Sequence, residues 1–278
     1  MTEPMASPAE QLSQETVDFY CQAMETLQQA GVPFLVGGAY AYARYTGVVR
    51  HTKDFDVFLD PADFDSALEA FEKKGWKVER NFPHWLGKTW NDNGEDFVDL
   101  IFSSGNGVAR VDHRWFEHAV DEEVLGMKVK LCPAEEMIWS KSFIMERERF
   151  DGADVAHLLH ARADDIDWER MLERFEGHHR VLFAHVLLFG YIYPGEAHRI
   201  PERVFEHLLA KVREDRHQAR NDKDLCRGTI LSRGQYLLDV EEWDYKDARI
   251  AHGHMTEEEV GVWTEAAREE EKKQLDKS

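Results

Sequence analysis

The sequence FLVGGAYAYARYTGVVRHTKDFDVFL, residues 34–59, indicates the fold and the candidate site of this 278-residue chain. It begins with a short apolar run that ends at Gly37-Gly38, and a segment of helical character follows. The motif Asp54-x-Asp56 then opens a second apolar run. Because side chains alternate across a strand, the two carboxylates of this motif are expected on one face of a sheet.

Two neighbouring carboxylates repel each other and raise each other's pKa unless a cation lies between them. Hard oxygen ligands of this kind suit Mg²⁺, which completes its shell with water and substrate phosphate. Gly37-Gly38 lets the backbone approach a ligand closely, and the amides that open the next helix form an anion site. Phosphate on the glycines and metal on the aspartates together predict a nucleotide site.

The order of strand, Gly-Gly, helix, Arg and Asp-x-Asp strand resembles the DNA polymerase β-like nucleotidyltransferase superfamily. The small bacterial type, which includes aminoglycoside nucleotidyltransferases and AbiE toxins, has an arginine shortly before the Asp-x-Asp motif. Arg50 supplies it here, within the segment RHTK that ends at Lys53. The resemblance covers roughly residues 30–160 and implies Mg²⁺-dependent transfer of a nucleoside monophosphate from an NTP to an acceptor.

The resemblance also implies roles for the acidic residues. Asp54 and Asp56 would hold two Mg²⁺ ions, and a third metal carboxylate would come from a neighbouring strand. Asp99, inside the apolar run FVDLIF, is the candidate, because a buried carboxylate is costly unless it is paired or metal-bound. Asp99 on a solvent-facing strand is the alternative, and Asp96, nearer the turn, is the competing residue.

Cations near the triphosphate are expected to stabilise the charge that develops during transfer. Arg50, Lys53 and Lys141 are the candidates, and a salt-bridged or surface position is the alternative for each. Lys141 and Asp154 resemble a helical Lys followed by an R-x-x-x-D-x-x-D-like segment in the small bacterial enzymes. Asp154 would orient Lys141 or act as a base.

The expected fold class is α+β, with a mixed, twisted sheet and flanking helices in a nucleotidyltransferase domain over residues 1–131. Residues 132–278 are expected to form an all-helical domain, because helical patterns dominate after Cys132-Pro133. The turn signal at residues 91–94 predicts a hairpin between two β-rich runs, and residues 124–129 predict a further strand.

Composition narrows the function classes. Three cysteines without metal-ligand spacing and an N-terminus without a signal-peptide pattern favour a reduced, cytoplasmic protein with no membrane partner. No H-E-x-x-H or G-x-S-x-G motif supports a hydrolase. The formal charge of -20 favours a small, cationic acceptor over tRNA. A tRNA-modifying toxin and a catalytically inactive nucleotide-binding protein remain the alternatives, and the oligomeric state stays open.

Overall fold

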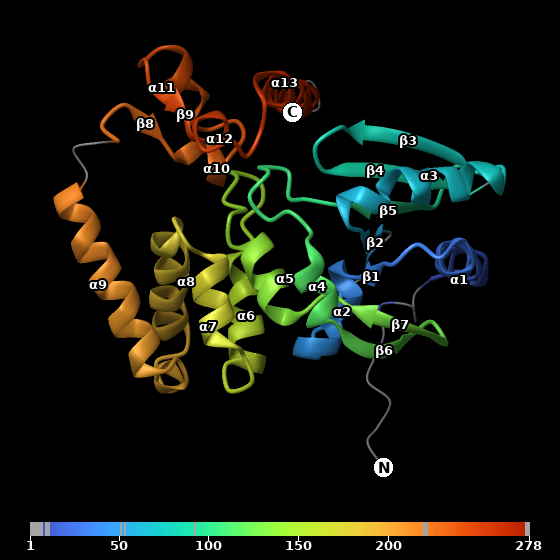
Figure 1. Ribbon diagram of the computed structural model, residues 1–278, viewed down its shortest axis with the longest axis horizontal. Coiled ribbons are helices and arrows are strands. Elements are labelled where there is room, and N and C mark those ends of the chain that lie inside the picture. Colours follow the sequence, from blue (N-terminus) through green and yellow to red (C-terminus); the bar gives the residue numbers. More distant parts are fainter. Residues whose placement is uncertain are drawn as a thin grey trace. The chain divides into compact units, whose positions relative to one another are not determined.

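Figure 1 shows the computed structural model, which describes residues 12–50, 54–91, 93–218 and 222–275, together with Pro8 and Thr52. These residues fall into two compact units. The first lies within Met1–Gly105 and Arg110–Pro133, and the second within Asn106–Ala109 and Ala134–Ser278. No helix in these ranges is both long and apolar enough to cross a membrane.

The first unit contains a seven-stranded mixed sheet with the order β3-β4-β5-β2-β1-β7-β6. Strand β2 pairs in parallel with β5, β1 pairs in parallel with β7, and the other neighbours are antiparallel. The strands are β1 (Leu35–Val36), β2 (Asp54–Phe58), β3 (Lys77–Phe82), β4 (Leu86–Trp90), β5 (Phe97–Ile101), β6 (Val120–Val124) and β7 (Met127–Leu131). The predicted α+β class with a mixed sheet is confirmed.

One face of this sheet is covered by helices. Tyr20 of the first helix stacks on Phe55 of β2, with 4.7 Å between ring centroids. The third helix packs against the first and lies beside β3 (Figure 1). The opposite face of β2 and β5 carries their aspartates together with Phe58, Phe97 and Ile101. The helices of this unit are α1 (Gln14–Ala30), α2 (Gly38–Thr46), α3 (Phe64–Lys73), which follows the 3-10 turn η2 (Pro61–Asp63), and α4 (His113–Glu117).

Two hairpins of the first unit, β4–β5 and β6–β7, differ in how well the sequence predicted them. The predicted hairpin around residues 91–94 is confirmed, although Asp92 itself lies outside the described residues. Residues 124–129 do not form one strand. Leu125 and Gly126, with φ of 54° and 79°, make the turn of a hairpin between β6 and β7.

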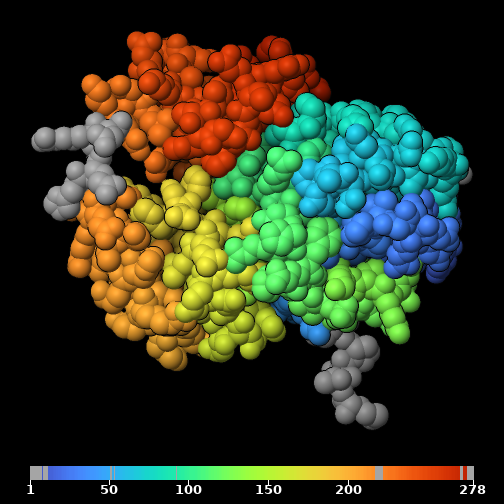
Figure 2. Space-filling view, viewed as in Figure 1, coloured from blue at the N-terminus to red at the C-terminus, as the bar shows by residue number. Residues whose placement is uncertain are grey.

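The second unit is helical apart from the parallel pair β8 (Leu225–Cys226) and β9 (Lys246–Asp247), which corrects the expectation of an all-helical region. Helices α8 and α9 pack side by side, yellow and orange in Figures 1 and 2. The division into functional domains at residues 131 and 132 stays a prediction. The helices are α5 (Ala134–Lys141), α6 (Gly152–Arg162), α7 (Trp168–Arg174), α8 (His179–Ile192), η3 (Ala197–Arg199), α9 (Glu202–Gln218), α10 (Gly228–Leu231), α11 (Leu237–Glu241), α12 (Ala248–Ala251) and α13 (Glu257–Leu275).

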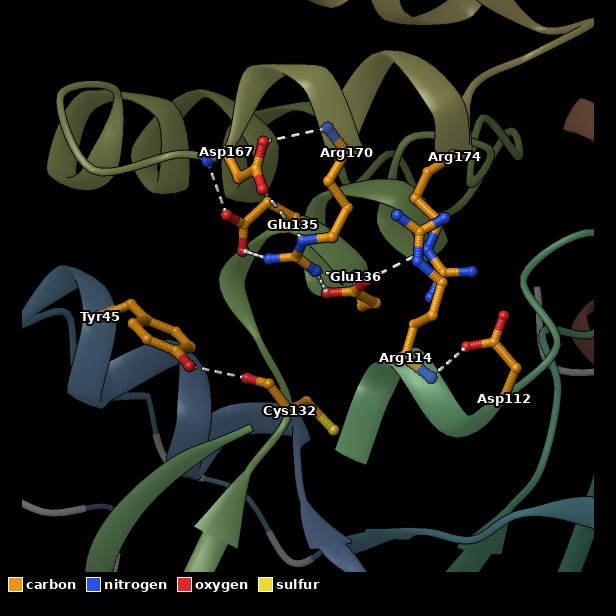
Figure 3. A network of polar contacts seen from close by, with 9 residues as sticks. All are labelled: Tyr45, Asp112, Arg114, Cys132, Glu135, Glu136, Asp167, Arg170 and Arg174. Atoms are coloured by element: carbon orange, nitrogen blue, oxygen red, sulfur yellow. Dashed lines mark hydrogen bonds and ion pairs between the residues drawn. The ribbon is translucent and has the colours of Figure 1, made fainter. Parts of the chain in front are cut away.

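A buried ionic network joins α5 to α7. Glu136 is fully buried, and Figure 3 shows it bound by the side chains of Arg170 and Arg174. Arg170 Nη1 donates to both carboxylate oxygens of Glu136 at 2.6 Å, and Arg174 Nε donates at 3.1 Å. Arg170 Nη2 also pairs with Glu135 at 2.8 Å. A buried ion pair of this kind depends on keeping all its partners, because a lone buried charge is costly.

We expect Glu136→Gln to destabilise the helical unit by about 3–5 kcal/mol, because Arg170 and Arg174 lose the buried carboxylate that they share. Glu169→Gln is the matched control, since Glu169 pairs with Arg203 at the surface, where both side chains are more than half exposed. That change should cost much less, because exposed ion pairs contribute little to stability. Urea unfolding of both variants measures the difference, and equal losses would contradict a role for burial.

Three histidines cluster elsewhere in the second unit. The ring centroid of His178 lies 5.7 Å from that of His254, which lies 5.9 Å from that of His252. Burial, and then the neighbouring His254, lowers the pKa of His178 from 6.5 to about 4. The unfolded chain therefore takes up a proton on this residue at a higher pH than the folded chain. Stability is lost as the pH falls through this window.

His178→Phe should reduce the loss of stability between about pH 7 and about pH 5, because the neutral ring has no proton to take up. Phe143, which packs edge-on against His178 at 5.2 Å, should accommodate the new ring. The exposed His207 provides the control variant His207→Phe. Urea unfolding at the two pH values tests the prediction, and an unchanged pH dependence in His178→Phe would contradict it.

Candidate functional site

Three aspartates share one face of the central sheet. Asp56 of β2 lies opposite Asp99 of the parallel strand β5, and Asp54 lies two residues before Asp56 on β2. Phe55 and Val57 alternate with them and are fully buried on the other face. Asp54 is exposed, whereas Asp56 and Asp99 are half-buried. The structure therefore gathers the three carboxylates predicted from the sequence on the side of β2 and β5 that α1 does not cover.

Gly37 and Gly38 lie directly beside this acidic face. The Gly37 N–H donates to the backbone carbonyl of Asp56 at 3.0 Å. Gly38 has a φ of 51°, and a Cβ at this position would lie 1.7 Å from Asp56 Oδ2. Only glycine fits there without moving the carboxylate. Gly37 is the N-cap of α2 and forms no side-chain cap, so the first amides of the helix are suited to bind an anion.

Lys88 is a site residue that the sequence analysis missed. It lies opposite Asp99 on the antiparallel strand β4, and its Nζ is 2.7 Å from Asp99 Oδ1. The same ammonium lies 3.8 Å from the centroid of the Phe97 ring. Burial raises the pKa of Asp99, the ammonium of Lys88 opposes that rise, and the charge of Asp54 adds to it. The sequence predicted the hairpin but not its register, which pairs residues 88 and 99.

The donors on this face suit a hard divalent cation. Asp54 and Asp56 provide carboxylate oxygens, and the absence of a side chain at Gly38 keeps the surroundings of the Asp56 carboxylate open. Among the residues that the structure describes, no three His, Cys, Asp or Glu side chains lie close enough to hold one ion together. Asp99 instead forms an ion pair with Lys88. The residues therefore fit metal binding at the Asp-x-Asp motif, with Asp99 already held by an internal cation.

The three basic residues predicted to stabilise the triphosphate lie in different parts of the chain. Arg50 is exposed, and its Nη2 donates to the Tyr42 hydroxyl at 3.3 Å. Lys53 lies outside the described residues. Lys141 belongs to the second unit, where its Nζ donates to Asp154 at 2.8 Å and to Asp151 at 2.9 Å. The predicted association of Lys141 with Asp154 is thus present as an ion pair.

Two further acidic residues have structural partners. Arg149 donates to both oxygens of Asp151 at 2.9 and 3.0 Å. Although burial raises the pKa of Asp151, Arg149 and Lys141 together hold it below its usual range. Asp96, the competitor of Asp99 in the sequence, accepts from the Thr16 hydroxyl at 3.2 Å and from the Asn91 amide at 3.0 Å. It therefore fastens the hairpin turn to α1.

No protein-family model and no curated protein matches the chain. Among solved structures it is similar to the antibiotic-resistance factor ANT(2″)-Ia in solution, at 14% identity over 76% of this chain and 100% of that chain, with a TM-score of 0.39. It is also similar to the lincosamide antibiotic adenylyltransferase LnuA with lincomycin bound, at 14% identity over 54% of this chain and 99% of that chain, with a TM-score of 0.37. A third similar structure is that of a nucleotidyltransferase-like protein from Paracoccidioides brasiliensis. The identity is 14% over 68% of this chain and 94% of that chain, with a TM-score of 0.41. At such identities and scores, assigning a function depends on the residues of the site itself.

Gly38→Ala should destabilise the first unit and displace the Asp56 carboxylate, because the new methyl group would overlap Oδ2. Gly47→Ala is the control, since Gly47 has a φ of 71° but nothing within 4 Å of an added Cβ. The control should lose about 1–2 kcal/mol from backbone strain alone. Gly38→Ala should lower the free energy of unfolding by more than the control does, as measured by thermal unfolding. It should also weaken Mn²⁺ binding in calorimetry. Equal behaviour of the two variants would contradict the close packing of Gly38 on Asp56.

Proposed function

We propose that this chain is a Mg²⁺-dependent nucleotidyltransferase that moves a nucleoside monophosphate from an NTP to a hydroxyl group of a small acceptor. The observation that supports this most is the register of β2 and β5. It sets Asp56 opposite Asp99 with Asp54 on the same face. The glycines that precede α2 lie against the same carboxylates. Hard oxygen donors and a helix N-terminus side by side suit a metal-bound triphosphate.

Each part of the site has a task in this proposal. Asp54 and Asp56 would hold two Mg²⁺ ions, which when bound supply charge stabilisation to the attacking and leaving oxygens. The backbone of Gly37 and Gly38 would bind the β- and γ-phosphates. Asp99 would serve as the third metal carboxylate and would accept the proton that the acceptor hydroxyl loses. The acceptor oxygen forms a bond to the α-phosphorus, the bond to the bridging oxygen breaks, and pyrophosphate leaves.

Positive charge would stabilise the triphosphate in this proposal. Arg50 and Lys53 precede the Asp-x-Asp motif in the sequence, and Lys141 would act as a point charge. Asp154 would orient the Lys141 ammonium, which it already contacts at 2.8 Å. Transfer depends mostly on positioning and charge stabilisation. Loss of one such cation should therefore lower the rate of nucleotidyl transfer strongly and change the stability of the fold little.

The acceptor is proposed to be small and cationic. The chain carries 54 acidic and 34 basic residues, so its overall field attracts cations and repels a long phosphate backbone. A tRNA acceptor would need a local basic strip that outweighs this field. A third possibility is a protein that binds nucleotide without transferring it, for which three costly carboxylates on one face have little use.

The proposed activity is tested by incubating the protein with Mg²⁺ and each of four α-labelled NTPs, with cell metabolites and total RNA as separate acceptor pools. We expect label in the metabolite pool, and at least about a 10²-fold lower rate for Asp56→Asn, because a charge-stabilising group is lost. Asp65→Asn is the control, since Asp65 is an exposed residue of α3 that pairs with Arg80 at 2.5 Å.

The possible outcomes separate the alternatives. Label in the RNA pool would replace the small acceptor with a tRNA-type one. Calorimetric binding of Mg·NTP without transfer by the wild type would support the nucleotide-binding protein. A protein that binds no Mg·NTP would contradict the proposal as a whole.

A further inference from the structure

We infer that Lys88 is a built-in counter-ion that competes with a divalent cation for Asp99. The inference rests on the proposed metal and nucleotide site, and it concerns when that site can use its third carboxylate. It assigns Lys88 a positioning role, because Lys88 contacts Asp99 and acts on the metal through it.

The Lys88–Asp99 pair is well enough buried to be more than a surface contact. The two side chains are only 22% and 14% exposed, and 2.7 Å separates Nζ from Oδ1. The Phe97 ring lies 3.8 Å from the same ammonium and limits its freedom. Antiparallel pairing of β4 with β5 fixes the two residues opposite each other. An ion pair with this support is more stable than an exposed one, whose side chains are mobile and screened by salt.

The surroundings of the pair explain why a counter-ion is useful. Asp99 lies opposite Asp56, and the charge of Asp54 helps to raise the pKa of Asp99. Three carboxylates on neighbouring strands repel each other when no cation is bound. The ammonium of Lys88 is the cation that this chain itself provides to Asp99, so it stabilises the metal-free protein.

The same ammonium opposes the binding of metal to Asp99. A divalent ion on this carboxylate would meet the positive charge of Lys88 at close range in a half-buried setting, where charges are weakly screened. The ion must therefore either displace Lys88 or bind less tightly.

The inference is tested by calorimetric titration of the full chain with Mn²⁺ alone, without nucleotide. Lys88→Met should bind Mn²⁺ at least about fivefold more tightly than the wild type, because the competing charge is gone. Lys88→Arg keeps the charge and should resemble the wild type. Lys77→Met is the matched control, since Lys77 lies on β3, is 70% exposed and pairs with Glu79 at 3.6 Å.

Two further measurements distinguish competition from general damage. In EDTA, Lys88→Met should melt at a lower temperature than the wild type, and saturating Mn²⁺ should narrow that gap. In the Asp99→Asn background, adding Lys88→Met should leave Mn²⁺ affinity unchanged, because the carboxylate under competition is absent. This double variant also remains informative if the single Lys88→Met variant folds poorly.

Unchanged or weaker Mn²⁺ binding by Lys88→Met would overturn the inference, because Lys88 would then only hold Asp99 in place. Failure of the proposed function gives a different result. In that case the wild type would bind no Mn²⁺, or its binding would be unaffected by Asp54→Asn, and both the site and the inference would be overturned.

Discussion

The parallel pairing of β2 with β5 is the constraint on which the candidate site depends. It places Asp56 opposite Asp99, while the buried residues Phe55 and Val98 pair on the opposite face. A slip of one residue would turn the aspartate side chains of β2 toward the core and the apolar ones toward solvent. The hydrophobic packing of one face therefore fixes the positions of the charges on the other. Core stability and site geometry are set by the same register.

The order of the strands explains why a glycine pair meets an aspartate that follows it by eighteen residues. Strand β1 runs antiparallel to β2, with Val36 opposite Val57, so the next residue, Gly37, reaches Asp56. The chain then turns at once into α2, whose N-terminus begins beside the acidic strand. A side chain at Gly38 would fill the space that the carboxylate uses. The topology thus brings the N-terminus of α2 and the carboxylate of Asp56 together.

Local patterns in the sequence were sufficient for the acidic strand, the Gly-Gly break, the helical segment that follows it, and the hairpin that carries Asp99. Each depends on alternation, a turn signal or a helix end within a few residues. Lys88 was missed because its role depends on hairpin register, which a loop of several residues leaves open. The turn at Leu125 was missed because leucine rarely adopts a positive φ. The pairing of Glu136 with Arg170 spans 34 residues and has no local signal.

Two ionic clusters of this chain differ in the way their negative charges are balanced. In the second unit, Glu136 is fully buried and bound by two arginines, so its charge is matched within the protein. On strands β2, β4 and β5, the carboxylates of Asp54, Asp56 and Asp99 share one face, and Lys88 forms an ion pair with Asp99. Neighbouring carboxylates repel each other, and a cation that binds between them reduces this repulsion. An arrangement that is more stable with a ligand than without one is typical of a binding site, whereas the matched cluster needs nothing further.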